Sequence, residues 1–168
     1  MSLLSSKILR LITPAILENK KLVLQLMRWR IENQQYYASQ PHVTEKSFRN
    51  WLNKYVFEKP KLLFLVLDDT ANPIGHMGLQ FRKKYCEIDN VVRGEQKQKG
   101  RIGEALDAFI QWVFKNTPYT ELWLRVLSNN DHAIEFYKKH GFVPVRKVIV
   151  RRGSPLRFLK IKYGILNK

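Results

Sequence analysis

The alternation of apolar and polar residues divides the chain into short segments of two kinds. Apolar or alternating runs bounded by turn residues indicate strands, and apolar residues that recur every three or four positions indicate helices. On this basis we expect strands over residues 7–12, 61–67, 74–81, 87–92, 121–127, 142–150 and 157–163.

The expected helices are marked by capping residues as well as by their spacing. Thr13 and Thr44 are suited to begin two helices in the first third of the chain. The longest apolar stripe predicts a helix over residues 101–115. A polar cluster at 128–131 precedes a short helix that we expect to stop at Gly141, since glycine is common just after a helix.

The order of these elements predicts the fold class. Hairpins and helical crossovers alternate along the chain, which favours one mixed sheet flanked by helices, an α/β or α+β layer structure. We find no internal repeat and no linker long enough to divide the 168 residues. The prediction is therefore a single domain over residues 1–168.

Composition excludes several classes of protein. The longest apolar run, residues 62–67, is far shorter than the ~20 residues that span a bilayer, and the N-terminal segment does not read as a secretory signal. One cysteine, Cys86, rules out an internal disulfide framework. The four histidines lack the spacing of metal ligands. We therefore expect a cytoplasmic protein with no membrane span and no metal.

The charge balance is unusual. Thirty Lys and Arg residues against fourteen Asp and Glu residues give a net charge of +16. After Glu135 the chain contains no acidic residue at all. Such a balance indicates an anionic partner, either nucleic acid, an acidic membrane surface or a phosphorylated small molecule, unless the protein is merely basic.

The segment at residues 90–103 lies between a predicted strand and the longest predicted helix. A helix N-terminus has unpaired backbone N–H groups and a positive dipole end, which together attract anions. Gly100 would let a phosphate approach the backbone, and Lys97, Lys99 and Arg101 add positive charge. The segment is neither a Walker A loop nor a dinucleotide fingerprint.

A second segment is more specific. It reads Asn130-Asp131-His132-Ala133-Ile134-Glu135-Phe136-Tyr137-Lys138-Lys139-His140-Gly141-Phe142. Its asparagine, alanine, Phe-Tyr and Gly-Phe positions closely resemble motif B of the GNAT superfamily of acyl-CoA-dependent N-acyltransferases. The segment from Gln98 to Gly103 resembles motif A of the same family at its first and last positions. It departs at Arg101, where the family usually has glycine, which leaves Gly100 to do the same job in a shifted loop.

The resemblance implies a mixed, mostly antiparallel sheet of about six or seven strands with about four flanking helices. It also implies acetyl-CoA as co-substrate, held in a wedge-shaped gap between two strands that splay apart. The coenzyme-binding residues that it implies are Val91, Val92, Gln98, Lys99, Gly100, Arg101, Ile102, Gly103, Asn130, Ala133, Phe136 and Tyr137. Asn130 could contact the pantetheine arm, cap its own helix, or do both.

The resemblance further implies direct transfer, in which an amine attacks the thioester carbonyl within a ternary complex. Glu87 and Asp89 lie two positions apart, hence on one face of a strand, and either could serve as the base. Glu87 lies nearest the family's usual glutamate, although either acid could simply pair with surplus Lys or Arg. Tyr137 occupies the position of the family's tyrosine acid, unless it is only a packed aromatic residue. A water chain is the remaining candidate base.

The amine acceptor stays open at this stage. The resemblance extends to amino-sugar acetyltransferases and to N-terminal acetyltransferases of ribosomal proteins, so a small-molecule or peptide amine is expected. The aromatic and basic residues of the early helical region would suit a nucleotide-linked sugar or another anionic acceptor; they are Arg28, Trp29, Arg30, Tyr36 and Tyr37. A homodimer is also open. The competing class is a catalytically inactive GNAT-fold protein, or a basic protein that binds nucleic acid or the ribosome.

Overall fold

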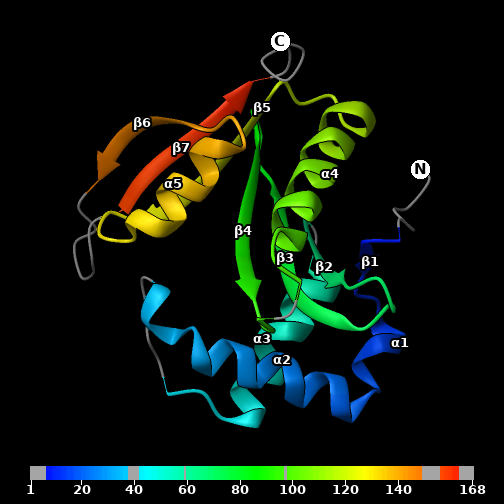
Figure 1. Cartoon of the computed structure of the whole chain (residues 1–168). Helices are drawn as coiled ribbons and strands as arrows, with labels where there is room; N and C mark the ends of the chain where they lie inside the picture. Colours follow the sequence, from blue (N-terminus) through cyan, green and yellow to red (C-terminus); the bar gives the residue numbers. More distant parts are fainter. Residues whose placement is uncertain (1–6, 38–41, 59, 97, 149–155, 163–168) are drawn as a thin grey trace.

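The computed structural model describes residues 7–37, 42–58, 60–96, 98–148 and 156–162. Within this part, seven strands form one sheet in the order β1-β2-β3-β4-β5-β7-β6 (Figure 1). The elements along the chain are β1 (Leu9–Leu11), α1 (Pro14–Leu17), α2 (Lys20–Glu32), the 3-10 helix η1 (Gln34–Tyr36), α3 (Glu45–Phe57), β2 (Lys61–Leu67), β3 (Pro73–Phe81), β4 (Cys86–Arg93), α4 (Arg101–Asn116), β5 (Glu121–Leu127), α5 (Asp131–Lys139), β6 (Val143–Val148) and β7 (Leu156–Lys162).

The predicted fold class is confirmed, and the order of elements follows the expected one. Every strand pair in the described sheet is antiparallel except β4 with β5. The last residues of two expected strands, 149–150 and 163, lie outside the described residues. The expected first helix is divided in two, because the side chain of Asn19 accepts a hydrogen bond from Leu22 N and starts α2 afresh.

Helices cover both faces of the sheet, and each face has its own apolar core. On one face the stripe of α4, including Leu106, Phe109 and Ile110, packs against β2, β3, β4 and β5. On the other face α2 and α3 pack through Leu26 and Leu52 against β2 and Val92 of β4. The sheet is therefore a central layer, and side chains on β4 point alternately to the α4 face and to the α2–α3 face.

The relationship of β4 to β5 decides where the sheet opens. The two strands pair only over Cys86–Ile88 and Leu122–Leu124, although β4 continues to Arg93 and β5 to Leu127. Beyond this short ladder the strands separate. A β-bulge lies at the point of separation, because two residues, Asn90 and Val91, lie between Asp89 and Val92 on β4 where β3 has only Met77 between their partners.

The bulge is centred on a residue with an uncommon backbone conformation. Asn90 has φ of 47°, in the left-handed region that asparagine adopts more readily than most residues. After the bulge, Val91 packs on the α4 core and Val92 on the α2–α3 core. The bulge thus changes the direction of β4 just beyond the point where its pairing with β5 ends.

Candidate active site

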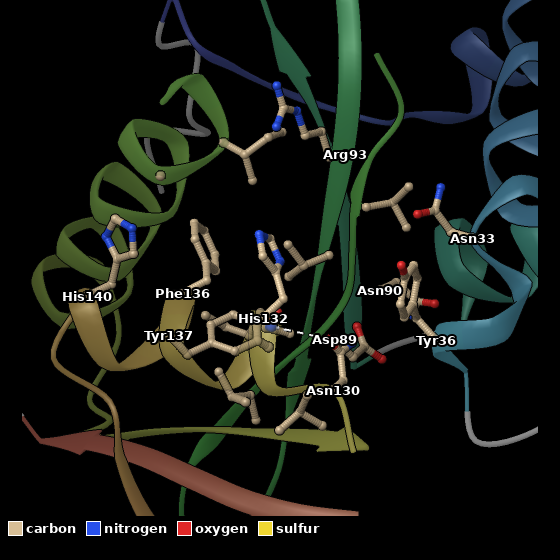
Figure 2. Close-up of a pocket in the computed structure, with 18 of the residues that line it drawn as sticks. Asn33, Tyr36, Asp89, Asn90, Arg93, Asn130, His132, Phe136, Tyr137 and His140 are labelled. Atoms are coloured by element: carbon tan, nitrogen blue, oxygen red, sulfur yellow. Dashed lines mark hydrogen bonds between the residues drawn. The ribbon is translucent and has the colours of Figure 1, made fainter. Parts of the chain in front are cut away.

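A cleft of about 1510 Å³ lies where β4 and β5 separate. Its walls come from β4, the end of β5, the start of α4 and the inner face of α5, and its far side comes from the residues that follow α2. In Figure 2, Phe136, Tyr137 and His140 lie on one side of this cavity, and Asn33 and Tyr36 lie on the other. A volume this large exceeds the roughly 300–1,000 Å³ typical of a single small-molecule site, so two ligands could share it.

The edge of the cleft at α4 has the geometry of an anion site. Gly100 is the N-cap of α4 with φ of 89°, and Gln98 before it has φ of 55°. The backbone N–H groups of Ile102 and Gly103 form no hydrogen bond within the described part of the chain. Both residues line the cleft, so the unpaired donors and the positive end of the helix dipole lie at the cavity wall.

Arg101 has a different role from the one that its charge suggests. Its side chain, 16% exposed, forms ion pairs with Asp69 and Glu104 and donates from Nε to the carbonyl of Leu67. It is therefore directed to the β2–β3 turn and does not line the cleft. Lys99 is exposed and does not line the cleft either, and Lys97 lies outside the described residues. At this edge of the cleft the structure therefore presents the backbone N–H groups of Ile102 and Gly103, and not the side chains of Lys99 and Arg101.

His140 and Asp107 add a pair of side chains that the sequence did not single out. His140 Nδ1 lies 2.6 Å from Asp107 Oδ1, and its ring lies 4.8 Å from that of Phe136. A Cβ at Gly103 would stand 3.0 Å from the His140 ring, so the glycine lets the imidazole pack against the first turn of α4. The pairing joins positions 33 apart, which no local pattern reveals.

Asp89 is held in a buried polar network. Tyr55 of α3 donates its hydroxyl to Asp89 Oδ1, and Gln80 of β3 donates to Oδ2. The Asn90 side chain donates to the Tyr55 oxygen at 3.0 Å. Burial raises the pKa of the Asp89 carboxyl above its ordinary value, although these donors oppose the shift. Tyr55 and Gln80 were missed by sequence reasoning because they come from other elements.

Glu87 lies on the same face of β4 as Asp89, as expected, but has a different environment. Its side chain is 5% exposed, and its two oxygens form ion pairs with Arg82 and Arg125. Protonating this carboxylate would leave two guanidinium groups without their counter-charge. Both acids line the cleft or its floor, and their assignment as base stays a prediction.

Tyr137 lies on the inner face of α5 and lines the cleft (Figure 2). Its ring packs between Phe136 and Phe142, and its hydroxyl forms no hydrogen bond with a described residue. Burial, together with the nearby Tyr37 and Asp89, raises the pKa of the Tyr137 phenol, so the hydroxyl stays protonated. A protonated phenol with an unused O–H is suited to donate a hydrogen bond or a proton into the cavity.

Most of the other expected coenzyme residues also line the cleft. Asn130 caps α5 by accepting from Ala133 N at 3.1 Å and still faces the cavity, so both of its expected roles are compatible with its position. The predicted residues that line the cleft are Val91, Val92, Gln98, Gly100, Ile102, Gly103, Asn130, Ala133, Phe136 and Tyr137.

The expected aromatic and basic wall is smaller than the sequence suggested. Trp29 is fully buried, and Arg28 pairs with Glu95. Tyr36 and Tyr37 do line the cleft, and the Arg30 guanidinium lies over the Tyr37 ring, 3.3 Å from its centroid.

The sequence also matches a known protein family. A family model described as an acetyltransferase (GNAT) domain matches residues 8–143. The chain belongs to the GNAT acetyltransferase family. The membership predicted from the two sequence motifs is thereby confirmed.

Solved structures of this GNAT fold resemble the chain along nearly its whole length. A spermidine N-acetyltransferase from Vibrio cholerae, in complex with CoA and spermine, has 20% sequence identity and a TM-score of 0.74, and the match covers 95% of this chain and 97% of that one. A chimera of the Vibrio cholerae enzyme SpeG and hSSAT has 20% identity and a TM-score of 0.75, with 97% and 100% of the two chains covered. No curated protein matches the sequence.

No group of three or more His, Cys, Asp or Glu side chains in the described ranges is arranged to hold a metal ion. Within the same ranges, none of the helices has the length and apolar character needed to cross a bilayer.

Proposed function

We propose that the protein transfers the acetyl group of acetyl-CoA directly to a primary amine within a ternary complex, with an amino sugar or a protein N-terminus as acceptor. The observation that carries this proposal is the separation of β4 from β5 beside the unpaired N–H groups of α4. A thioester on an extended arm fits the open strand edges, and a diphosphate fits the helix N-terminus.

The coenzyme half of the cleft is built from backbone groups. The N–H groups of Ile102 and Gly103 would bind the diphosphate, and the β4 edge beyond Ile88 would pair with the pantetheine arm. Asn130, Ala133 and Phe136 would form the opposite wall. A backbone N–H near Val91, after the bulge, would polarise the thioester carbonyl.

The chemistry requires one bond to form, one to break and one proton to move. The amine nitrogen forms a C–N bond to the acetyl carbon, and the C–S bond breaks. The nitrogen loses a proton to a base, and the departing sulfur gains one. The chain must therefore supply a proton acceptor beside the amine and a proton donor beside the sulfur.

Asp89 is the better candidate for the proton acceptor. Its pKa is raised by burial, which brings its proton affinity closer to that of a base working near neutral pH. Glu87 is bound on both oxygens by arginine, and its protonation would break two ion pairs. We therefore assign Glu87 the role of orienting Arg125. The alternative to Asp89 as the base is a water molecule.

Tyr137 is the candidate proton donor. It faces the cleft from α5, opposite β4, and its phenol keeps its proton because burial raises the pKa. The hydroxyl has no partner among the described residues, so it is available to the departing sulfur.

The proposal is tested by measuring free thiol released from acetyl-CoA in the presence of amino sugars, amino-acid amides, polyamines and peptides. A parallel thermal-shift experiment adds acetyl-CoA alone. At about 100 times its Kd the ligand should stabilise the folded state by roughly 2.7 kcal/mol. Absence of both thiol release and a thermal shift, together with a large shift caused by RNA or DNA, would show a binding protein instead of an enzyme.

A further inference from the structure

The half of the cleft opposite α4 and α5 has a charge pattern of its own. We call it the acceptor side and define it by Tyr36, Tyr37, Glu87, Asp89 and Arg125, all of which line the cleft. It lies on the face of the sheet that α2 and α3 cover. In the proposed function the amine must approach from here, because the coenzyme occupies the side next to α4.

The carboxylates of the acceptor side are already engaged. Glu87 is shared by Arg82 and Arg125, and Asp89 accepts hydrogen bonds from Tyr55 and Gln80 on its two oxygens. A polycationic acceptor gains affinity from ionised carboxylates that have no other counter-charge. Glu87 does not offer this, because both of its oxygens are paired with arginine, and Asp89 is left as the one acid of the acceptor side with no counter-charge among the described residues.

Three guanidinium groups lie at or near the acceptor side, although only that of Arg125 lines the cleft. Arg82 and Arg125 share one carboxylate, which leaves a positive charge. Arg30 lies behind the Tyr37 ring, and no described Asp or Glu side chain pairs with it. The count of three arginines against two acids therefore includes Arg30 and Arg82, which lie outside the lining of the cleft. The raised pKa of Asp89 makes the balance more positive.

Arg125 is placed to use this charge. It lies one residue beyond the β4–β5 ladder, and its side chain is 42% exposed. It donates to Glu87 from Nε, and its two terminal nitrogens form no hydrogen bond with a described residue. A guanidinium fixed at one nitrogen with its fork free is suited to bind phosphate oxygens in a bidentate manner. The exposed ring of Tyr36, also in the cleft wall, offers a surface for a sugar or base.

We infer that the acceptor is a primary amine on a phosphate-bearing sugar, with Arg125 as the phosphate contact and Arg30 as its electrostatic support. This inference rests on the proposed function and names the substrate class of that site. It distinguishes this chain from the similar Vibrio cholerae structure, which is a complex with the polyamine spermine.

The experiment uses calorimetric titration of the full chain with CoA already saturating, so that anionic probes cannot bind in the coenzyme half. The probes are glucosamine, glucosamine 6-phosphate, UDP-glucosamine and spermidine. We expect a phosphate-bearing probe to bind at least about ten-fold more tightly than glucosamine, and spermidine more weakly than either phosphate-bearing probe. The two phosphate-bearing probes distinguish a sugar phosphate from a sugar nucleotide.

Three variants separate this site from general charge. Arg125→Gln should remove most of the phosphate preference, and Arg30→Gln should reduce it. Arg49→Gln, which removes an exposed arginine paired with Glu45 on α3, should leave it unchanged. Arg30→Lys serves as a second variant that keeps the charge if Arg30→Gln does not fold, and the CoA-induced thermal shift reports folding for every variant.

The outcomes are distinct. Equal or weaker binding of both phosphate-bearing probes relative to glucosamine overturns the inference, as does tight binding of spermidine or turnover of a peptide N-terminus alone. In each of these cases the CoA-induced shift persists, and the proposed function stands. Loss of the CoA-induced shift in the unmodified chain contradicts the proposed function itself.

Discussion

Gly94 lies flat against the indole ring of Trp29, so closely that a Cβ at position 94 would overlap the ring. The next residue, Glu95, accepts a hydrogen bond from Trp29 Nε1 at 3.0 Å and pairs with Arg28. The helix beside the acceptor side is thus joined directly to the segment that leads from β4 to the start of α4.

Adding a methyl group at this contact should loosen that connection. We expect Gly94→Ala to destabilise the fold by at least about 3 kcal/mol, the upper end of the usual cost of overpacking, since a Cβ would stand 2.0 Å from a ring carbon of a buried indole. Chemical denaturation measures the change. Gly100→Ala is the matched control. A Cβ there meets no atom within 4 Å, so the cost is backbone strain alone at φ of 89°, about 1–2 kcal/mol. Equal losses in both variants would contradict the packing argument.

Removing the proposed base should change both the rate and its pH dependence. We expect Asp89→Asn to lower kcat on the order of 10²-fold, the usual contribution of a general base. Because the base must be ionised, kcat of the unmodified protein should fall as the pH drops through the raised pKa of Asp89. The acidic limb of the pH profile should therefore lie above the ordinary range for aspartate.

Glu87→Gln is the control for that experiment. It should lower the stability, because Arg82 and Arg125 lose their shared counter-charge, and keep the acidic limb of the profile in place. If the acidic limb of the kcat profile disappeared in Glu87→Gln and remained in Asp89→Asn, the base would be Glu87.

Tyr137→Phe isolates the hydroxyl from the ring. The ring contacts with Phe136 and Phe142 persist in the variant, so coenzyme affinity measured by titration should change little. Turnover should fall because the departing sulfur loses its proton donor. Unchanged turnover removes Tyr137 from the acid role, and a large loss of coenzyme affinity would mean that its hydroxyl binds rather than protonates.

His76 should make the stability of the fold sensitive to acid. It is 2% exposed, and burial lowers its pKa from 6.5 to about 4. The unfolded chain therefore binds a proton at a higher pH than the folded chain, and this stability is complete above pH 6.5 and lost as the pH falls toward 4. Between pH 7.5 and 5 the loss should be about 2 kcal/mol.

The non-titrating variant His76→Gln provides the comparison. Denaturation curves at the two pH values give the change in unfolding free energy for each protein, and the difference between them isolates His76 from the other titrating groups. An equal acid sensitivity in both proteins would show that His76 does not carry the effect.

The elements of this protein follow from local signals in the chain. The stripe of α4, the Asn130 cap and the stop at Gly141, where φ is 86°, all depend on residues within one or two turns of each other. The break between α1 and α2 could also be predicted from the sequence, because Asn19 is a capping residue in the middle of an apolar pattern. The segment that we expected to bind an anion does lie between β4 and the start of α4, since a strand, a glycine and a helix start are consecutive in the sequence.

The side chains around the reacting centre could not be foreseen in the same way. Arg101 follows its loop in sequence, yet its guanidinium binds Asp69, which the β2–β3 turn brings alongside. Asp89 meets Tyr55 from 34 positions away, and Glu87 meets Arg125 from 38 positions away. These pairs depend on which strands are neighbours and on their register.

The sequence alone thus determined the family, the succession of elements and the helix N-terminus at the cleft wall, because motifs, caps, turns and apolar periods act over a few residues. Only the tertiary structure decided which acid is buried in a hydrogen-bonded network, which acid is held by arginine, and which side chains line the cleft. The physical reason is that desolvation and charge pairing depend on distances across the sheet and on burial by α2 and α3, and neither quantity exists until the layers have packed.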